Sequence, residues 1–140
     1  MKKYKGVIDT NILFAGLYSA SGASHQILRY IDNNTIVPIL STTLLFEYED
    51  ILKRNQKKLE LTSTAIEQIL NAICKRGEEH SIHFLWRPQL SDPKDDHILE
   101  LSVAAGCADI VTFNIKDFAN AKSFGIRIVK PDLFINFVTR

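Results

Sequence analysis

The sequence predicts a three-layer α/β/α domain, in which helices cover both faces of a mostly parallel sheet of about five strands. Short apolar, β-branched runs alternate along the chain with longer segments of helical periodicity, and this alternation is typical of βαβ units. The length of 140 residues is close to the commonest size of a single domain. No repeat, linker or low-complexity tract interrupts the sequence, so residues 1–140 are expected to form one domain.

The strands are expected over residues 5–9, 36–40, 81–86, 110–112 and 126–129. Each is a short run rich in β-branched or aromatic residues and bounded by polar or turn-forming residues. Pro38 interrupts the second run. Because proline cannot donate a ladder hydrogen bond, it indicates an edge or irregular position there.

Helices are expected over residues 12–17, 24–31, 41–55, 64–77, 92–106, 116–123 and 133–138. Their apolar residues recur three and four positions apart, weakly in the first helix and most clearly in the fourth. The N-cap candidates are Ser41, Thr42 and Thr43 for the third helix, Thr64 with Glu67 for the fourth, and Asp92 before Pro93 for the fifth. Gly77 and Gly106 are expected to end the fourth and fifth helices.

Composition and hydropathy exclude the disordered and membrane-spanning classes. Apolar residues make up 46% and charged residues 24% of the chain, close to the averages for globular proteins. No apolar stretch approaches the roughly 18 residues needed to cross a bilayer. The basic N-terminus reaches Asp9 and Asn11 too soon for a signal peptide, so we expect a cytoplasmic protein. Cys74 and Cys107 lack a CxxC partner or a histidine at zinc spacing and are predicted to be buried free thiols.

The formal charge of +1, from 17 basic and 16 acidic residues, carries no message about nucleic acid by itself. If three or four acids gather around a metal ion, the rest of the surface is net basic. The residues that would then face phosphates are Lys53, Arg54, Lys57, Lys58, Lys75 and Arg76. The alternative is that these residues only keep the outer faces of helices in contact with water.

Acidic and amide side chains stand at or soon after the carboxyl ends of the predicted strands. They are Asp9 after the first strand, Glu47 in the helix after the second, Asp95 and Asp96 after the third, and Asn114 and Asp117 after the fourth. In an open parallel sheet the carboxyl ends of the strands meet at one edge, where ligands bind. We therefore expect these side chains to lie close together.

Such a cluster favours a bound divalent cation. Two like charges about 4 Å apart repel by roughly 4 kcal/mol at an effective dielectric constant near 20. Carboxylate oxygens suit Mg²⁺ or Mn²⁺, which also bind phosphate oxygens and activate water. Phosphodiester hydrolysis is therefore the reaction class that best fits the pattern.

The individual residues differ in how strongly they indicate a site. An acid that closes a buried apolar strand, as Asp9 does, must find polar partners or a metal ion. Asp95 has an equally good alternative, since an acid in the first turn of a helix complements the helix dipole. Glu47 shares its helix with other acids, so its position alone is a weaker indication of a site. The histidines have no zinc spacing and are interpreted as structural or surface residues; they are His25, His80, His83 and His97.

Four short motifs follow one another along the chain. They are Val7-Ile8-Asp9-Thr10-Asn11, Ser41-Thr42 with Leu45-Phe46-Glu47-Tyr48, Asp95-Asp96-His97-Ile98-Leu99, and Ile110-Val111-Thr112-Phe113-Asn114 continued to Asp117-Phe118. Their order and strand context resemble the PIN-domain family, and most of all the toxin-type PIN ribonucleases of bacterial toxin–antitoxin pairs. The resemblance covers nearly the whole chain, from residue 5 to about residue 129.

The resemblance implies a PIN-like fold and a Mg²⁺- or Mn²⁺-dependent endoribonuclease that acts on RNA. It also implies partners, since such enzymes are commonly homodimers and are often held inactive by a small antitoxin protein. Asp9, Glu47 and Asp96 match the three principal acidic positions, which are catalytic and bind the metal. The supporting residues match as well: Asn11 beside the first acid, and Ser41 and Thr112 as small hydroxyl residues at strand ends.

One residue departs from the family pattern. Asn114 stands where a fourth acid is common, so the affinity for metal and the number of ions depend on what replaces that charge. Asp117 lies three residues later and is the candidate metal ligand for this role.

The C-terminal stretch over residues 133–138 is unusually apolar for a helix in contact with solvent. We expect it either to pack in the core or to form a homodimer contact, a role that the helix over residues 64–76 could also fill.

Two other functions remain open at this stage. A phosphatase of the haloacid dehalogenase type also has an aspartate after its first strand, but it needs a second aspartate two residues later, where this chain has Asn11. The other alternative is a non-catalytic PIN-like module that binds RNA or protein. Asn114 favours this module, whereas the retained Asp9, Glu47 and Asp96 favour an enzyme.

Overall fold

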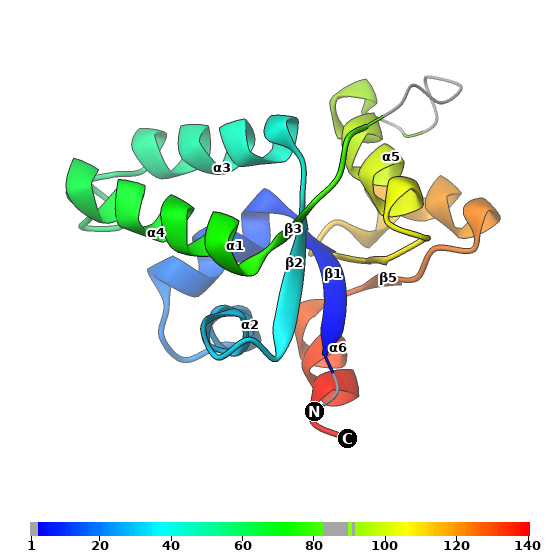
Figure 1. Cartoon of the computed structure of the whole chain (residues 1–140), viewed down its shortest axis with the longest axis horizontal. Helices are drawn as coiled ribbons and strands as arrows, with labels where there is room; N and C mark the ends of the chain where they lie inside the picture. Colours follow the sequence, from blue (N-terminus) through cyan, green and yellow to red (C-terminus); the bar gives the residue numbers. More distant parts are fainter. Residues whose placement is uncertain (1–2, 83–89, 91) are drawn as a thin grey trace.

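The computed structural model describes residues 3–82, 90 and 92–140, which form one parallel sheet with helices on both faces (Figure 1). The strands are β1 (Tyr4–Ile8), β2 (Ile36–Leu40), β3 (Glu78–Glu79), β4 (Asp109–Val111) and β5 (Ile128–Val129). The α-helices are α1 (Thr10–Tyr18), α2 (Ala23–Asp32), α3 (Thr42–Arg54), α4 (Ser63–Arg76), α5 (Asp96–Ala104) and α6 (Pro131–Val138), and the 3₁₀ helices are η1 (Pro93–Asp95) and η2 (Ile115–Phe124). The predicted three-layer α/β/α fold is confirmed.

The strand order is β3-β2-β1-β4-β5, so β1 lies at the centre of the sheet. Gly6 of β1 lies opposite Pro38 of β2 on one side and opposite Asp109 of β4 on the other. All the strand pairs are parallel, and the carboxyl ends of the strands therefore share one edge of the sheet. The helices α1 and α3 begin at this edge, directly after β1 and β2.

Pro38 does not mark an edge strand, because β2 lies between β1 and β3. The strand β3 is only two residues long and pairs with Ile39 and Leu40. Pro38 precedes that pairing, so its missing N–H removes no ladder bond to β3.

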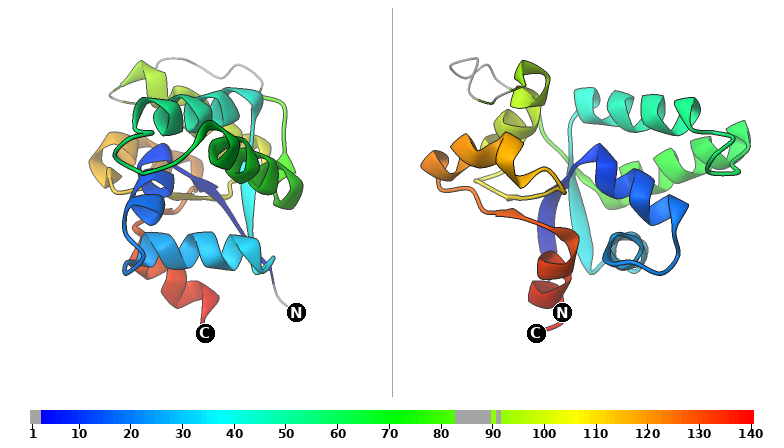
Figure 2. Two further views of the ribbon diagram at one scale, coloured as in Figure 1. Left: turned by 90° about the vertical axis from the view of Figure 1, so that its left-hand side faces the viewer. Right: turned by 180° about the vertical axis from the view of Figure 1, so that it is seen from behind.

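Two apolar cores flank the sheet. Consecutive residues of a strand face opposite sides, so Val7 belongs to the core beneath α3, α4 and α5, and Ile8 belongs to the core beneath α2 and α6. Figure 2 shows α2 and α6 side by side, near the two chain ends. Phe134, Ile135 and Val138 of α6 are buried there. Of the two roles expected for the C-terminal stretch, core packing is the one observed.

The third strand lies earlier than predicted. We expected it over residues 81–86, but β3 is Glu78–Glu79, residues 81 and 82 are outside any strand, and residues 83–86 lie outside the described part of the chain. The position follows from close packing at Gly77, where a Cβ atom would lie 2.3 Å from Leu40 Cδ1. This contact brings the chain against β2 immediately after α4 ends.

The start of α4 also differs from the prediction. Thr62, rather than Thr64, caps the helix, and its hydroxyl oxygen accepts a hydrogen bond of 3.0 Å from the backbone N–H of Ala65. The predicted caps at Ser41 and Asp92 and the helix end at Gly77 are confirmed.

Both cysteines are free thiols, as predicted, but the prediction that they are buried is wrong. Cys74 lies on the outer side of α4, whose buried residues are Ile66 and Ile73. Cys107 has a positive φ of 64° in the turn after α5, which directs it to the surface. Within the part of the chain that the structure describes, no helix is long and apolar enough to cross a membrane.

Candidate active site

Asp9 lies at the carboxyl edge of the sheet, between β1 and α1, and its carboxylate is fixed by two hydrogen bonds. Oδ1 accepts from the backbone N–H of Thr10 at 2.8 Å, and Oδ2 accepts from the hydroxyl of Thr112 at 2.7 Å. Asp9 is only 7% exposed. Burial raises the pKa of the Asp9 carboxyl above its usual value, and the charge of Glu47 raises it further, against the lowering effect of the two hydrogen bonds.

Thr112 directly follows β4, the neighbour of β1 in the sheet, and links the Asp9 carboxylate to that strand. Its buried hydroxyl donates to Asp9 and accepts from the backbone N–H of Asn114 at 3.0 Å and from Asn11 Nδ2 at 3.5 Å. One donor and two acceptor positions are thus all used. Among the described residues, the buried Oδ1 of Asn11 has no hydrogen-bond partner. The predicted supporting residues Asn11 and Thr112 therefore do lie beside Asp9.

Glu47 approaches the same edge from α3. The helix is capped by the buried Ser41, whose Oγ accepts from the backbone N–H of Leu44 at 3.1 Å, so the role of Ser41 is to fix the start of α3. Glu47 Oε2 lies 2.7 Å from Nε2 of His97 on α5. His97 was interpreted as a structural or surface residue, but the structure places it at the site.

His97 is buried, and its Nδ1 has no partner among the described residues. The other described histidines have structural contacts, since His25 Nδ1 lies 2.9 Å from the Gly16 carbonyl oxygen and His80 Nε2 lies 2.7 Å from Glu78. His83 lies outside the described residues.

Asp95 is the last residue of η1, and the pKa of its carboxyl is raised strongly by burial and by the neighbouring acids. Burial makes the largest contribution to this shift, which raises the pKa to about 6. The charges that raise it further are, in decreasing order, those of Asp9, Asp92, Asp117 and Glu47. Residues from four segments of the chain thus act on Asp95, as expected for acids gathered at one edge.

Asp96 has a different environment from its neighbour. It is 1% exposed, and its Oδ1 accepts a hydrogen bond of 2.9 Å from the backbone N–H of Leu90. Asp96 therefore stabilises the chain segment before η1, whereas Asp95 is half-buried at the acid cluster. The assignment of Asp96 as a catalytic and metal-binding residue stays a prediction.

Asn114 and Asp117 lie at the start of η2. Asn114 is exposed, and its carbonyl oxygen accepts from the backbone N–H of Asp117 at 3.1 Å. Asp117 is half-buried, and its charge is one of those that raise the pKa of Asp95. The structure thus brings the carboxylate of Asp117 within electrostatic reach of the cluster, although Asn114 holds the position that the sequence motif assigns to the fourth acid.

Tyr48 supports the site from beneath. Tyr48 is buried, and its hydroxyl donates to the carbonyl oxygen of Ile8 at 2.5 Å. Burial and the charges of Asp9 and Glu47 raise the pKa of Tyr48 above its ordinary value, so it remains a donor. The bond fixes α3 to the end of β1, next to Asp9.

The oxygen donors at this edge fit Mg²⁺ or Mn²⁺ in kind. Asp9, Glu47, Asp95 and Asp117 are coupled through their charges, and the unpartnered Oδ1 of Asn11 adds a neutral oxygen beside Asp9. Within residues 3–82, 90 and 92–140, however, no three His, Cys, Asp or Glu side chains form a group that could hold an ion. The donors are thus suitable in chemical kind, and they would have to move closer together to hold an ion.

Two exposed aromatic rings belong to residues that adjoin the site residues in the sequence. The large apolar side chains exposed in the described structure are Tyr18, Phe46, Phe113 and Leu133. Phe46 directly precedes Glu47 and is 65% exposed, and Phe113 lies between Thr112 and Asn114 and is 44% exposed. Exposed rings beside an acidic site offer flat surfaces on which bases can stack.

A family model described as PIN domain matches residues 5–116, which include Asp9, Glu47, Asp95 and Asp96 and end just before Asp117. No curated protein matches the chain.

Proposed function

Because the chain belongs to the PIN-domain family, whose fold is of the nuclease type, we propose that it hydrolyses the phosphodiester bonds of RNA with Mg²⁺ or Mn²⁺. The observation that carries the proposal is the cluster of coupled acids at the carboxyl edge of the sheet, where burial and neighbouring charges raise the pKa of Asp95 to about 6. A cation would relieve this repulsion, and a phosphate group could then approach.

The proposed metal ligands are the carboxylates of Asp9, Glu47, Asp95, Asp96 and Asp117. A bound ion would activate a water molecule and stabilise the charge that develops on the phosphoryl group. Thr112 keeps one oxygen of Asp9 in place through its hydrogen bond, and Tyr48 holds the helix that carries Glu47. These contacts fix one oxygen of Asp9 and the helix that carries Glu47 before any ligand binds.

The exposed rings of Phe46 and Phe113 support single-stranded RNA as the substrate. Stacking of one base on an aromatic side chain contributes about 1–3 kcal/mol and tolerates any base. An exposed ring on α3 and another on the segment after β4 would each offer a surface on which a base could stack. Paired bases would not be free to stack on these rings.

The test is cleavage of a fluorescent single-stranded RNA by the purified protein with Mn²⁺, with Mg²⁺ and with a chelator. We expect cleavage with either ion and none with the chelator. Binding of the RNA without cleavage under all three conditions would favour the non-catalytic module instead. Hydrolysis of a chromogenic phosphomonoester, without RNA cleavage, would favour the phosphatase.

We also propose that the chain is the toxin of a toxin–antitoxin pair, that a small antitoxin protein inhibits it, and that it forms a homodimer. The support is the resemblance of its motifs to toxin-type enzymes. Induced expression should then arrest growth, and an inactive Asp9→Asn variant should not. Growth arrest that persists with this variant would count against a nuclease toxin.

The proposed dimer contact is α4, since α6 is occupied in the core. A small apolar pocket of about 180 Å³ opens where α4 meets α1 and α2, with Ala72 and Ile69 in its wall. Light scattering should give the mass of a dimer for the wild type and a lower mass for Ala72→Arg. A monomer mass for the wild type at high concentration would overturn the dimer.

A further inference from the structure

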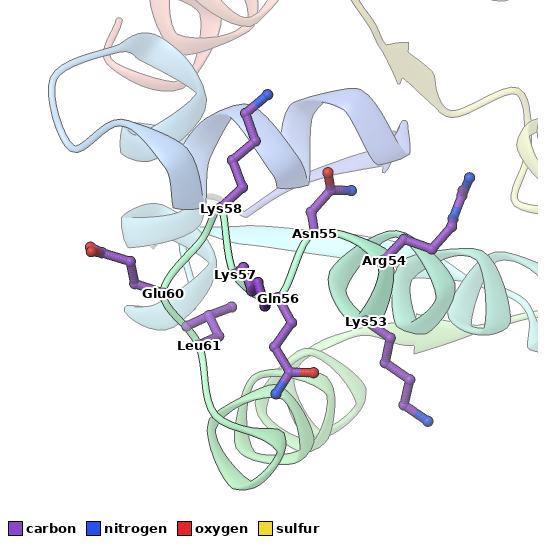
Figure 3. Close-up of a pocket in the computed structure, with 8 residues that line it drawn as sticks. All are labelled: Lys53, Arg54, Asn55, Gln56, Lys57, Lys58, Glu60 and Leu61. Atoms are coloured by element: carbon purple, nitrogen blue, oxygen red, sulfur yellow. The ribbon is translucent and has the colours of Figure 1, made fainter.

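The end of α3 and the loop that follows it form an open hollow of about 720 Å³ on the surface. The charged residues that line it are Lys53, Arg54, Lys57, Lys58 and Glu60 (Figure 3). Four of these charged side chains are thus positive and one is negative. We call this surface the basic hollow.

The cations of the basic hollow are only weakly engaged. Lys53 and Arg54 are each paired with an acid one turn earlier in α3, at 3.4 Å and 2.9 Å. Exposed pairs of this kind contribute little to stability and exchange easily for another anion. Lys57 and Lys58 form no ion pair with any residue that the structure describes. The hollow can therefore receive an anionic ligand without breaking a strong contact.

Aromatic rings adjoin the basic hollow. The Nζ atom of Lys58 lies 5.7 Å from the ring centre of Phe14 and 5.6 Å from that of Tyr18, both on α1. The two rings stack on each other, and Tyr18 is 58% exposed. Neighbouring cations and accessible rings are the combination with which proteins bind single-stranded nucleic acid.

The basic hollow adjoins the carboxyl ends of α1 and α3, whereas Asp9 of the acid cluster lies at the start of α1. Both α1 and α3 start at the carboxyl edge of the sheet and run to the hollow (Figure 1). With 9 and 13 residues, these helices are about 13 Å and 20 Å long at 1.5 Å per residue. A stacked nucleic-acid strand advances about 3.4 Å per nucleotide, so about four to six nucleotides would cover this distance.

We propose that the basic hollow binds the backbone of the same single-stranded RNA whose scissile phosphate lies at the acid cluster, about four to six nucleotides away. The inference rests on the proposed ribonuclease function. Lys53 and Lys58 project to opposite sides of the loop in Figure 3, so the cations spread out instead of converging on one point. A row of phosphates fits this spread better than a single phosphate does.

An acidic protein segment is the competing ligand for four cations. RNA is favoured for two reasons. The rings of Phe14 and Tyr18 adjoin Lys58, and aromatic rings offer stacking to bases but no matching contact to carboxylates. The helices that lead to the basic hollow begin at the acid cluster, so one strand of RNA can contact both surfaces.

The first test measures binding without cleavage, in the presence of a chelator, using a fluorescent single-stranded RNA of twelve nucleotides. The variant is Lys57→Gln with Lys58→Gln, and the control of equal charge is Lys3→Gln with Lys122→Gln, two exposed lysines outside the hollow. At 0.1 M salt, loss of two phosphate contacts should weaken binding about 10- to 30-fold, and the slope of log K against log salt should fall by about 1.4. The control should bind like the wild type.

Equal binding by the two double variants would overturn the inference. So would a preference of the wild type for polyglutamate over RNA of equal charge, which would indicate a protein ligand. Thermal melting of both variants checks that they are folded. Because this test needs no cleavage, its result is separate from that of the proposed nuclease activity.

The second test follows cleavage of RNAs of increasing length in Mn²⁺. For the wild type and the control, KM should fall once the RNA extends more than about six nucleotides from the cleaved bond. The variant of the basic hollow should lose this gain. A gain of equal size in all three proteins would contradict the inference, whereas absence of cleavage would contradict only the proposed function.

Discussion

The acid cluster and the basic hollow carry opposite charge in very different surroundings. Asp9 is 7% exposed and bonded to the backbone of α1 and to a side chain beyond β4. The cations of the hollow are exposed; Lys53 and Arg54 are paired within one helix, and Lys58 contacts two rings. Burial raises the pKa values of carboxyls in the acid cluster. The exposed cations of the basic hollow instead attract anions through solvent over a longer range.

This difference predicts two kinds of behaviour. The acid cluster should respond strongly to the loss of one atom that fixes a carboxylate. The basic hollow should respond to its total charge, in proportion and with a strong dependence on salt.

Loss of the Thr112 hydroxyl tests the first kind of behaviour with the largest expected effect. Thr112→Val keeps the shape but removes the hydrogen bond to Asp9 Oδ2. Loss of an outer partner of a metal ligand typically costs 10- to 100-fold in metal affinity or activity, and we expect this range for kcat/KM at limiting Mn²⁺. Thr112→Ser, which retains the hydroxyl, is the matched control. Equal activities of the two variants would show that Asp9 does not need this bond.

Removal of the Phe113 ring tests whether the surface beside the acids binds bases. Phe113→Ala should raise KM about 5- to 150-fold with little change in kcat, because one stacking contact contributes about 1–3 kcal/mol. Phe113→Tyr should behave like the wild type. The measurement is initial rates over a range of RNA concentration, and a fall in kcat alone would contradict a binding role.

Stability without metal should depend on pH in a direction set by Asp95. Its pKa is about 6 in the folded protein and 3.8 as a model value, so the folded state binds the proton more tightly. The free energy of unfolding should therefore fall as pH rises from about 4 to 6, and the penalty should be fully present above that window. After allowance for partial exposure, we expect about 1 kcal/mol, or about 2–4 °C in melting temperature.

Asp95→Asn should remove much of this dependence and raise the melting temperature at pH 7. Asp96→Asn is the matched control, since Asp96 is bonded to the backbone N–H of Leu90 and its replacement should bring no such gain. Thermal melting of the three proteins in a chelator at pH 5 and pH 7 provides the measurement. Equal shifts for both variants would contradict the distinction between these neighbouring acids.

The smallest effects are expected at the position of the missing fourth acid. Asp117→Asn should lower activity a few-fold more than Asp109→Asn, because Asp117 acts on Asp95 whereas Asp109 pairs with Arg127 at the opposite end of β4. Asn114→Asp should lower the Mg²⁺ concentration needed for half-maximal cleavage, since cation affinity in oxygen sites rises with ligand charge. Metal titrations in which these variants all match the wild type would remove both positions from the site.

The sequence predicted the frame of the fold and the position of Asp9 well, because both depend on strong local signals. The apolar run of the first strand stops at Asp9, and Ser41 stands directly before a helix. These two signals mark the edge of the sheet. The strand β3 was misplaced because Glu78 and Glu79 have no apolar pattern. Only the approach of Gly77 to Leu40, a contact between distant segments, puts them in the sheet.

The details of the site depended on geometry that the sequence does not contain. Asp95 and Asp96 are adjacent, and the 3₁₀ turn before α5 gives them different surroundings. His97 and Glu47 are 50 positions apart, with no spacing signal to connect them. The six basic residues grouped by sequence do not form one surface, since Arg76, at the far end of α4, is paired with Asp32 instead of lining the basic hollow.

The claim that the acid cluster is a metal-dependent catalytic centre rests on Asp9, which is the most buried of the acids that act on Asp95. Asp9→Asn keeps the shape of the side chain and removes its charge, so the fold should persist and the apo protein should melt at or above the wild-type temperature. The deciding measurement is Mn²⁺-dependent cleavage of single-stranded RNA by the wild type and by this variant, purified in parallel. We predict that the variant loses nearly all of the activity, by at least about 100-fold, while it remains folded. Full cleavage by a folded Asp9→Asn variant would contradict the assignment of this cluster as the active site.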